Sequence, residues 1–226
     1  MRVVSDTLMQ RFTLALAASL WLHPAVVPAQ LSRPVQRGDR SIGGWAAASF
    51  YMQGGAHFAA IRERNLMITD LRSEWVLEDA GPFALATTMD LVPLVVVSRR
   101  AGPLRDCWTN QPSGRSQCQS AESAPTYGAG AHPLGIKLYL ANGARARLFA
   151  GGSVGMLFFN REMPIVGSNR MNFAVEYGGG VEANALGRSA IVVGWKFQHM
   201  SNGYTSPLNP GLDVNMLYLG LLRRRH

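Results

Sequence analysis

A serine two residues after a histidine, with an aspartate close behind, is the best candidate for chemistry in this chain. His199 and Ser201 lie in the segment 197–203, and Asp213 follows a loop rich in glycine, proline and asparagine. Successive side chains of a β-strand point to opposite faces, so His199 and Ser201 share one face, with Cα atoms roughly 7 Å apart. Ester hydrolysis by a serine needs a base and a group that orients the base. The pattern predicts Ser201 as nucleophile, His199 as base and Asp213 as the orienting acid.

The predicted strand that carries this pair has one apolar face. That face consists of Ile191, Val193, Trp195 and Phe197 and continues into His199 and Ser201. In the next predicted strand, the face of Asp213 continues through Asn215, Leu217, Leu219 and Leu221. The candidate site therefore stands at the end of an apolar stripe. A histidine two residues from a serine is also common in structural roles, and spacing alone leaves that alternative open.

The first 29 residues have the features of a signal peptide. Arg2 and Arg11 give a basic start, an apolar run extends from Phe12 to Leu22, and small residues precede Gln30. The run is too short for a membrane-spanning helix, which needs about 20 apolar residues. We expect cleavage near Ala29 and an N-terminal periplasmic segment at 30–42.

The charge balance of the exported chain indicates a membrane rather than a nucleic acid as partner. Loss of Arg2, Arg11 and Asp6 lowers the counts of basic and acidic side chains from 22 and 14 to 20 and 13, a formal net charge of +7. An exported chain rarely meets nucleic acid, so an anionic membrane surface is the expected partner, with general solubility as the alternative.

Two cysteines, Cys107 and Cys118, lie in one polar stretch. An oxidising compartment favours a disulfide between them. Their spacing suits no zinc site, and the sequence predicts no metal and no cofactor.

The rest of the chain predicts an all-β fold. Apolar and polar residues alternate in eight segments, at roughly 43–54, 66–79, 82–97, 127–140, 145–159, 171–184, 187–201 and 212–222. A soluble barrel buries the apolar face, whereas a membrane barrel turns it toward lipid. Alternation alone does not choose between them.

Three features favour an eight-stranded antiparallel transmembrane β-barrel over 43–222. Long polar connections at 55–65, 98–126, 160–170 and 202–211 alternate with tight turns such as that at Asn142-Gly143. The strands are longer than the usual five or six residues. The inner faces carry charges such as Arg72 and Glu74, with glycines that relieve crowding, so we expect a packed lumen rather than a pore.

Strand parity places the candidate site. With both termini periplasmic, the seventh strand ends at Ser201 on the external side, and the eighth begins there at Leu212. The site is thus predicted at the level of the outer leaflet. Residues 223–226 are expected to form a basic periplasmic tail. His57, His132 and His226 have no comparable neighbours and are expected on the surface or in loops.

The residues around the candidate site resemble one known family. His199-Met200-Ser201-Asn202 fits the His-x-Ser-Asn motif of the outer-membrane lipid A 3-O-deacylases, a family grouped with acyloxyacyl-hydrolase-related proteins, and residues 209–212 fit its next block. A looser similarity covers roughly 40–186. The resemblance implies an eight-stranded barrel with its site on the lipid-facing wall, His199 as base, Ser201 as nucleophile and Asn202 in the oxyanion hole, through its backbone N–H or its side-chain amide. The family's acidic position, a glutamate in its best-known members, falls on Asp213.

The sequence therefore predicts an outer-membrane serine esterase that removes the 3-hydroxyacyl chain at position 3 of lipid A. Arg62, Arg64, Arg99 and Arg100 are candidates to meet lipid A phosphates, or are solvated loop charges. Three alternatives stay open: a non-catalytic structural barrel, a phospholipase-like esterase acting on glycerophospholipids, and a soluble lipocalin-like barrel. The sequence also leaves open whether two copies form a homodimer.

Overall fold

The described part of the chain consists mainly of β-strands. The computed structural model describes residues 33–50, 64–99, 105–110, 115–120, 124–142, 146–185 and 187–225. The expected signal peptide, His57, His226, Arg62 and Arg100 lie outside these ranges. No helix among the described residues is long and apolar enough to cross a membrane. The strands are β1 (Arg40–Phe50), β2 (Arg64–Ala80), β3 (Phe83–Arg99), β4 (Arg105–Asn110), β5 (Arg115–Ser120), β6 (Thr126–Leu140), β7 (Ala146–Met163), β8 (Asn169–Asn184), β9 (Ser189–Ser201) and β10 (Leu212–Arg225).

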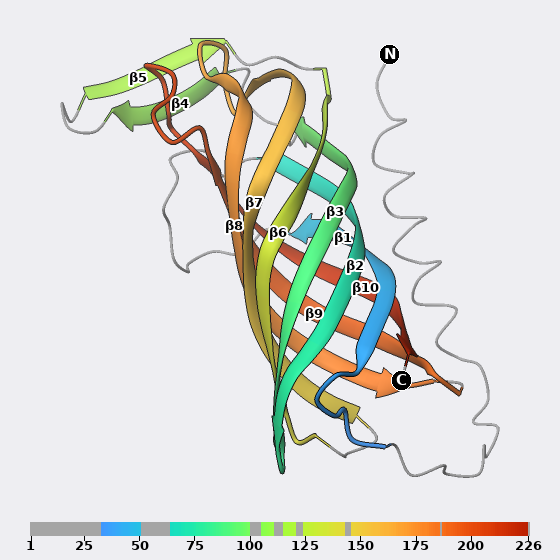
Figure 1. Cartoon of the computed structure of the whole chain (residues 1–226). Helices are drawn as coiled ribbons and strands as arrows, with labels where there is room; N and C mark the ends of the chain where they lie inside the picture. Colours follow the sequence, from blue (N-terminus) through green and yellow to red (C-terminus); the bar gives the residue numbers. More distant parts are fainter. Residues whose placement is uncertain are drawn as a thin grey trace, which may run out of the picture. The chain divides into compact units, whose positions relative to one another are not determined.

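Eight of these strands close into one antiparallel barrel (Figure 1). Their order around the ring is β1-β10-β9-β8-β7-β6-β3-β2, so the first and last barrel strands pair directly. Closure leaves no unpaired sheet edge, which a sheet in lipid requires. The predicted eight-stranded fold is confirmed. Each predicted segment overlaps one barrel strand, with the ends shifted by a few residues.

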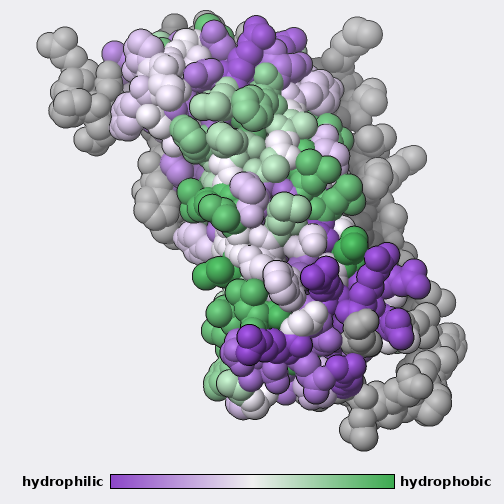
Figure 2. Space-filling model, in the orientation of Figure 1, coloured by the Kyte–Doolittle hydropathy of each residue, from purple (hydrophilic) through white to green (hydrophobic). Residues whose placement is uncertain are grey.

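The wall of the barrel has its apolar side chains outside. On β2, Leu71 is 55% exposed and Trp75 47%, whereas Asp70 and Glu74, on the other face, are 2% exposed. The remaining barrel strands show the same inversion, and hydrophobic residues cover much of the face drawn in Figure 2, with hydrophilic residues gathered toward its two ends. This is the pattern of a barrel whose solvent is lipid.

A network of buried charges fills the lumen. Lys137 Nζ lies 3.0 Å from Glu74 Oε2 and 2.8 Å from Glu182 Oε2. Arg72 pairs with Asp90 through two hydrogen bonds of 2.7 Å each. The predicted packed charges are therefore present, but Arg72 and Glu74 each have a partner on another strand. Two residues apart on β2, they point into the lumen side by side, and the neighbouring strands supply the opposite charges.

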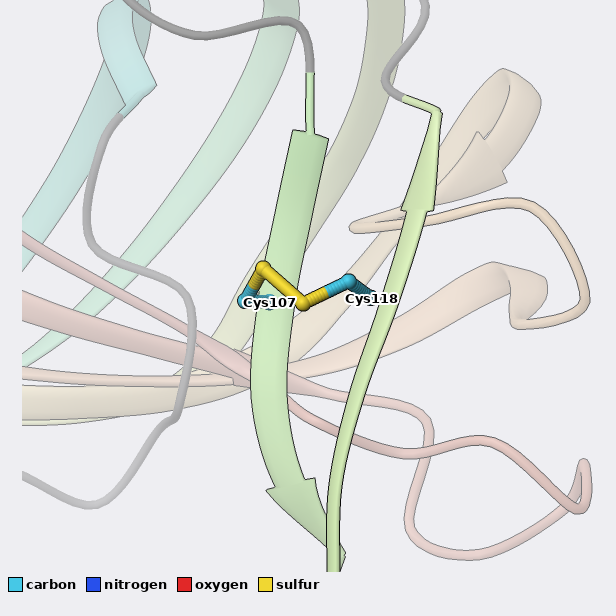
Figure 3. The surroundings of a disulfide bond; sticks show 2 residues. All are labelled: Cys107 and Cys118. Carbon is cyan, nitrogen blue, oxygen red and sulfur yellow. A yellow bond between two sulfur atoms is a disulfide. The ribbon is translucent and has the colours of Figure 1, made fainter.

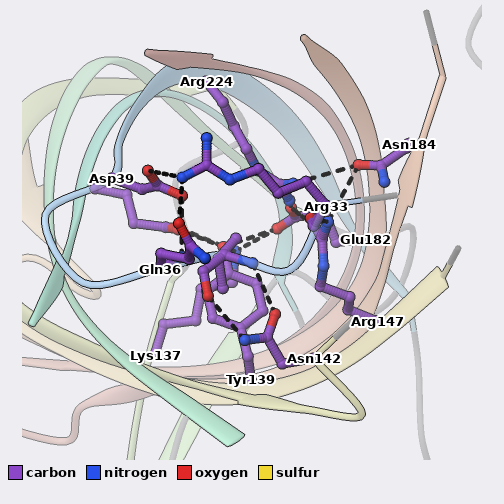
Figure 4. A network of polar contacts seen from close by, with 12 residues as sticks. Arg33, Gln36, Asp39, Lys137, Tyr139, Asn142, Arg147, Glu182, Asn184 and Arg224 are labelled. Carbon is purple, nitrogen blue, oxygen red and sulfur yellow. Dashed lines mark hydrogen bonds and ion pairs between the residues drawn. The ribbon is translucent and has the colours of Figure 1, made fainter. Parts of the chain in front are cut away.

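Part of each predicted end segment belongs to a barrel strand. Arg224 lies in β10, is 7% exposed and pairs with Glu182 in the lumen. At the same end of the barrel, Val35 is buried and exchanges two backbone hydrogen bonds with the Asn142 side chain. Figure 4 shows Arg224, Glu182 and Asn142 in one polar network with Arg33 and Arg147. The barrel strands therefore extend beyond the predicted bounds of 43–222, to Arg40 at one end and Arg225 at the other, and the periplasmic location of the segment before β1 stays a prediction. Arg224 faces the interior because the carboxylate of Glu182 binds it there. Hydropathy does not reveal such a partner.

A small hairpin replaces the unstructured connection expected at 98–126. Strands β4 and β5 pair antiparallel as a separate two-stranded sheet, with Cys107 directly opposite Cys118. The two cysteines form a disulfide, as predicted, and it links the two strands in Figure 3. A lone two-stranded hairpin is marginally stable in water, so this cross-link is what holds it together.

Candidate functional site

The His199–Asp213 contact is built by the pairing of β9 with β10. These antiparallel strands are joined by the loop 202–211, and their register places His199 directly opposite Asp213. Side chains directly opposite on one face of an antiparallel pair have Cβ atoms about 4.5–5.5 Å apart. His199 Nδ1 and Asp213 Oδ1 are 2.6 Å apart, a hydrogen bond of the charge-assisted kind. An aspartate therefore reaches the imidazole without the additional methylene of a glutamate.

The two partners differ in their access to the surroundings. The imidazole of His199 is 22% exposed and the carboxylate of Asp213 only 3%. Along the same faces, Val193 and Leu217 are 51% and 58% exposed on the outer wall. The hydrogen bond thus lies on the outward face of the sheet, with the acid covered and one side of the ring accessible. A carboxylate at Nδ1 fixes the imidazole tautomer that leaves Nε2 as the base.

Ser201 is the last residue of β9 and continues the same outward face. It is half-buried and stands opposite Phe173 of β8, just as His199 stands opposite Val175. Phe173 and Val175 are 42% and 45% exposed. Strand β8 therefore gives the candidate nucleophile and base an apolar outer border, which the sequence did not identify because it requires the β8–β9 register.

Asn202 lies off this face and holds the loop that follows. It is fully buried, its backbone N–H donates to Asn209 Oδ1 at 3.0 Å, and its Nδ2 donates to the Leu208 carbonyl at 2.8 Å. Its own Oδ1 accepts a hydrogen bond from the backbone N–H of Tyr204 at 2.9 Å. These contacts shape the 202–211 loop and engage the backbone N–H, the side-chain amide and the side-chain carbonyl of Asn202. The role of Asn202 in an oxyanion hole stays a prediction.

Other loops support the 202–211 loop at this end of the barrel. Ser206 Oγ donates to the Gly167 carbonyl at 2.6 Å, and Asn169 Nδ2 donates to Thr205 Oγ1 at 3.1 Å. The disulfide hairpin joins the same group, since Gln119 Nε2 donates to the Val166 carbonyl at 3.2 Å. The β4–β5 hairpin and the 202–211 loop therefore both form hydrogen bonds with the connection between β7 and β8. The sequence predicted these loops individually and not their contacts.

An aromatic cluster lies along the wall beneath the His199–Asp213 pair. The Tyr177 ring is centred 5.1 Å from that of Phe197 and 6.1 Å from that of Trp195. Trp195 Nε1 donates to Asn215 Oδ1 at 3.2 Å, which links β9 to β10 one step below the site. Phe197, expected to face lipid, is on the outward face but only 3% exposed. Rings on the outer wall cover part of one another, which alternation alone does not predict.

The remaining candidates do not join the site. His132, expected on the surface or in a loop, is in β6 and fully buried in the lumen, so that prediction was wrong. Two proline-containing register shifts in β3 and β6 reverse the alternation near it, and this conceals its orientation from the sequence pattern. Arg64 Nη2 lies 3.5 Å from the Pro164 carbonyl at the loop end of the barrel.

Several solved outer-membrane proteins are similar to this structure. The outer membrane enzyme PagL is 17% identical, covers 80% of this chain and 97% of its own, and superposes with a TM-score of 0.47. Neisserial surface protein A is 10% identical, covers 82% and 95%, and has a TM-score of 0.42. OprG from Pseudomonas aeruginosa is 12% identical, covers 84% and 97%, and also has a TM-score of 0.42. No curated protein sequence matches the chain.

A family model gives the decisive comparison. The model described as lipid A 3-O-deacylase (PagL) matches residues 102–221. That range is more than half of the chain and includes His199, Ser201 and Asp213. It ends within the last barrel strand. The chain therefore belongs to the lipid A 3-O-deacylase family, whose members are outer-membrane hydrolases.

Proposed function

We propose that this protein is a serine esterase that hydrolyses the ester-linked 3-hydroxyacyl chain at position 3 of lipid A. The observation that carries the proposal is the 2.6 Å contact between His199 and Asp213 on the outward face of the wall. A buried carboxylate that orients a partly exposed imidazole, two residues from a serine on the same face, is the arrangement required for nucleophilic acyl transfer. A soluble lipocalin-like barrel would carry its apolar residues inside, and this barrel carries them outside.

In the proposed reaction, Ser201 Oγ attacks the acyl carbonyl carbon while His199 Nε2 takes the hydroxyl proton. The tetrahedral intermediate collapses as the bond from the acyl carbon to the sugar oxygen breaks, and His199 returns the proton to that oxygen. Water, deprotonated by His199, then attacks the acyl-enzyme and releases the fatty acid together with free Ser201. Asp213 stays ionised throughout and stabilises the imidazolium. The mechanism uses residues of one chain, so it requires neither a cofactor nor a second copy.

Asn202 is the proposed oxyanion donor, through its side-chain amide. Its donors also hold Leu208 and Asn209, so the same residue would fix the loop and face the oxyanion. A single oxyanion-hole donor contributes roughly 10²–10³ in rate. We expect Asn202→Ala to lose at least this factor, because the loop also loses its central hydrogen bonds.

The position of the site suits a substrate that stays in the membrane. An acyl chain lying along the wall from Ser201 would meet Phe173, Val175 and the aromatic cluster below, all of which face outward. The ester would then sit at the upper end of the chain, level with His199. This position supports an acylated lipid as substrate. The choice of lipid A rests on the match to the family model.

Mass spectrometry of lipid A tests the proposal. Cells that express the wild-type chain should yield lipid A lighter by one 3-hydroxyacyl group, and cells that express Ser201→Ala at the same level in the outer membrane should not. Glycerophospholipids extracted from the same cells provide the second arm. Lipid A of unchanged mass together with accumulated lysophospholipid and free fatty acid would assign the site to phospholipid instead. A phenotype that survives Ser201→Ala would belong to a non-catalytic barrel.

A further inference from the structure

The lumen contains a cluster of ligand-type side chains that the proposed mechanism does not use. Asp70 of β2, Asp90 of β3 and His132 of β6 each direct one oxygen or nitrogen to a common point, with these three atoms within 4.8 Å of one another. All three side chains are buried, at 2%, 0% and 0% exposure. They come from three consecutive strands of the ring. We propose that this cluster binds a divalent first-row metal ion that joins β2, β3 and β6 inside the barrel.

Unsatisfied polar atoms are the observation that points to a ligand. Among the described residues, neither carboxylate oxygen of Asp70 and neither ring nitrogen of His132 has a hydrogen-bond partner. A buried polar group without a partner costs about 1–3 kcal/mol, and more when it is charged. Asp70 and His132 therefore each bring unsatisfied ligand atoms to the cluster, and a bound ion would satisfy them. A metal ion accepts electron pairs from carboxylate and imidazole at once, which no single protein donor in the cluster does.

The backbone is irregular where these residues lie. The β2–β3 register shifts between Thr69 and Leu71, the interval that contains Asp70. The β6–β7 register shifts between Ala131 and Leu134, the interval that contains His132. Such bulges re-aim side chains and are common next to functional sites. Asp70 and His132 both keep the inward phase of the residues that precede them, and the irregular backbone lies beside them.

A glycine makes room for the imidazole. A Cβ added at Gly155 of β7 would lie 2.6 Å from His132 Cα and close to the ring itself. No residue with a side chain fits at Gly155 while His132 keeps this place. The position of the ring is therefore specified from a fourth strand.

The ligand set and its surroundings suit a cation. A metal–ligand bond is about 2.0–2.4 Å long, so two ligand atoms on opposite sides of an ion are at most about 4.8 Å apart. The three ligand atoms of the cluster therefore need to move only slightly closer together to bind one ion. Two carboxylates and one imidazole suit Zn²⁺ or Mn²⁺. Glu176 Oε1 lies 3.9 Å from His132 Nδ1, where a carboxylate commonly accepts the second ring N–H of a metal-bound histidine. We therefore assign Nε2 to the ion.

The local charge balance agrees with this assignment. With neutral His132, the sector contains the carboxylates of Asp70, Asp90 and Glu176 and the cations Arg72 and Lys196. Arg72 already binds Asp90, and Lys196 binds Glu176 at 2.8 Å. Asp70 is the carboxylate without a hydrogen-bond partner in this sector among the described residues, and a bound cation would pair with it.

The experiment measures metal content and stability, so it does not depend on the esterase proposal. Untagged full-length protein, purified from outer membranes in detergent, is analysed for metals, stripped with chelator and titrated with Zn²⁺ and then Mn²⁺. We expect one equivalent of metal per chain, an unfolding temperature that rises on binding, and an X-ray absorption spectrum with oxygen and nitrogen ligands only. Asp70→Asn and His132→Gln should each weaken binding at least 100-fold. Glu74→Gln, a lumen carboxylate outside the cluster, should leave binding unchanged.

The melting temperatures of the metal-free proteins distinguish a metal site from a cluster that water or a proton satisfies. Without metal, Asp70→Asn should melt above the wild type, because it removes a buried charge, and the order should reverse when metal is added. Metal that persists in both cluster variants would mean an adventitious ion only and would overturn the proposal. So would a wild-type protein that neither contains metal nor responds to it, since water or a proton would then satisfy the cluster. If His132→Gln fails to insert, metal content and absorption spectra of the wild type still decide.

Discussion

At the scale of single residues, the structure brings Asp213 into direct contact with His199, at the position that the resemblance assigns to the acid of the family. The two side chains are direct cross-strand neighbours on one face, so no additional length is needed. The carboxylate is covered while the imidazole is partly exposed. The residue types and their shared face were predictable from the sequence. The 2.6 Å contact was not, because it depends on how the 202–211 loop sets the register of the hairpin.

Two substitutions of Asp213 test this contact. Asp213→Asn keeps the size of the side chain but removes the charge that stabilises the imidazolium, so kcat for lipid A deacylation should fall by roughly 10²–10⁴. Asp213→Glu restores the charge and should recover much of the loss. Both rates are measured on purified protein with lipid A in detergent micelles. Equal rates for the Asn variant and the wild type would remove Asp213 from the mechanism.

Asn202 is the residue for which structure and family resemblance emphasise different roles. The resemblance assigns it to the oxyanion hole, whereas most of its donors and its acceptor hold the loop. Asn202→Asp keeps the acceptor that binds Tyr204 but loses the Nδ2 donor. We expect kcat to fall at least 10²-fold. Limited proteolysis of the 202–211 loop is the control, because an intact loop with lost activity assigns the residue to the reaction.

At the scale of elements, the sequence predicted the eight barrel strands well because each is long and inverted in its alternation. It missed the β4–β5 hairpin because short strands in a polar stretch carry little periodic signal. It misjudged His132 because bulges near Pro93 and Pro133 shift the two-residue period. The predicted pairing of Cys107 with Cys118 was confirmed, since a disulfide across the hairpin joins directly opposed residues.

The hairpin should depend on its disulfide while the barrel does not. Replacing both cysteines with serine removes a cross-link worth about 3 kcal/mol to a loop of this size. We expect faster proteolysis within 105–120 and an unchanged melting temperature of the barrel, because β4 and β5 form a sheet of their own. Electrophoretic mobility of unheated samples reports the barrel and peptide mapping reports the hairpin. A barrel that fails to form would contradict this separation.

At the scale of the whole molecule, the fold places lipid-compatible side chains outside and a charge network inside. Glu182 binds Lys137, Arg147 and Arg224, residues that lie far apart in the sequence. The sequence indicated a packed, charged interior but not which charges meet. The final strand contributes to this network through Arg224, which hydropathy alone assigned to a tail.

Arg224 and Arg225 provide a matched test of this interior. Arg224→Met should destabilise the barrel by about 3 kcal/mol, near the lower end for a broken buried pair because Glu182 keeps Lys137 and Arg147. Arg225→Met, one residue away on the exposed face, should change stability little. Urea unfolding followed by tryptophan fluorescence measures both. Equal effects of the two substitutions would show that the inward position has no special role.

The central claim is the proposal that Ser201, which shares the outward face of β9 with His199, cleaves the ester at position 3 of lipid A. The most direct test is the release of 3-hydroxy fatty acid from purified lipid A, with wild-type protein compared with Ser201→Ala folded to the same extent. The account predicts stoichiometric release with the wild type and none above background with the alanine variant. Equal release by both proteins would contradict it.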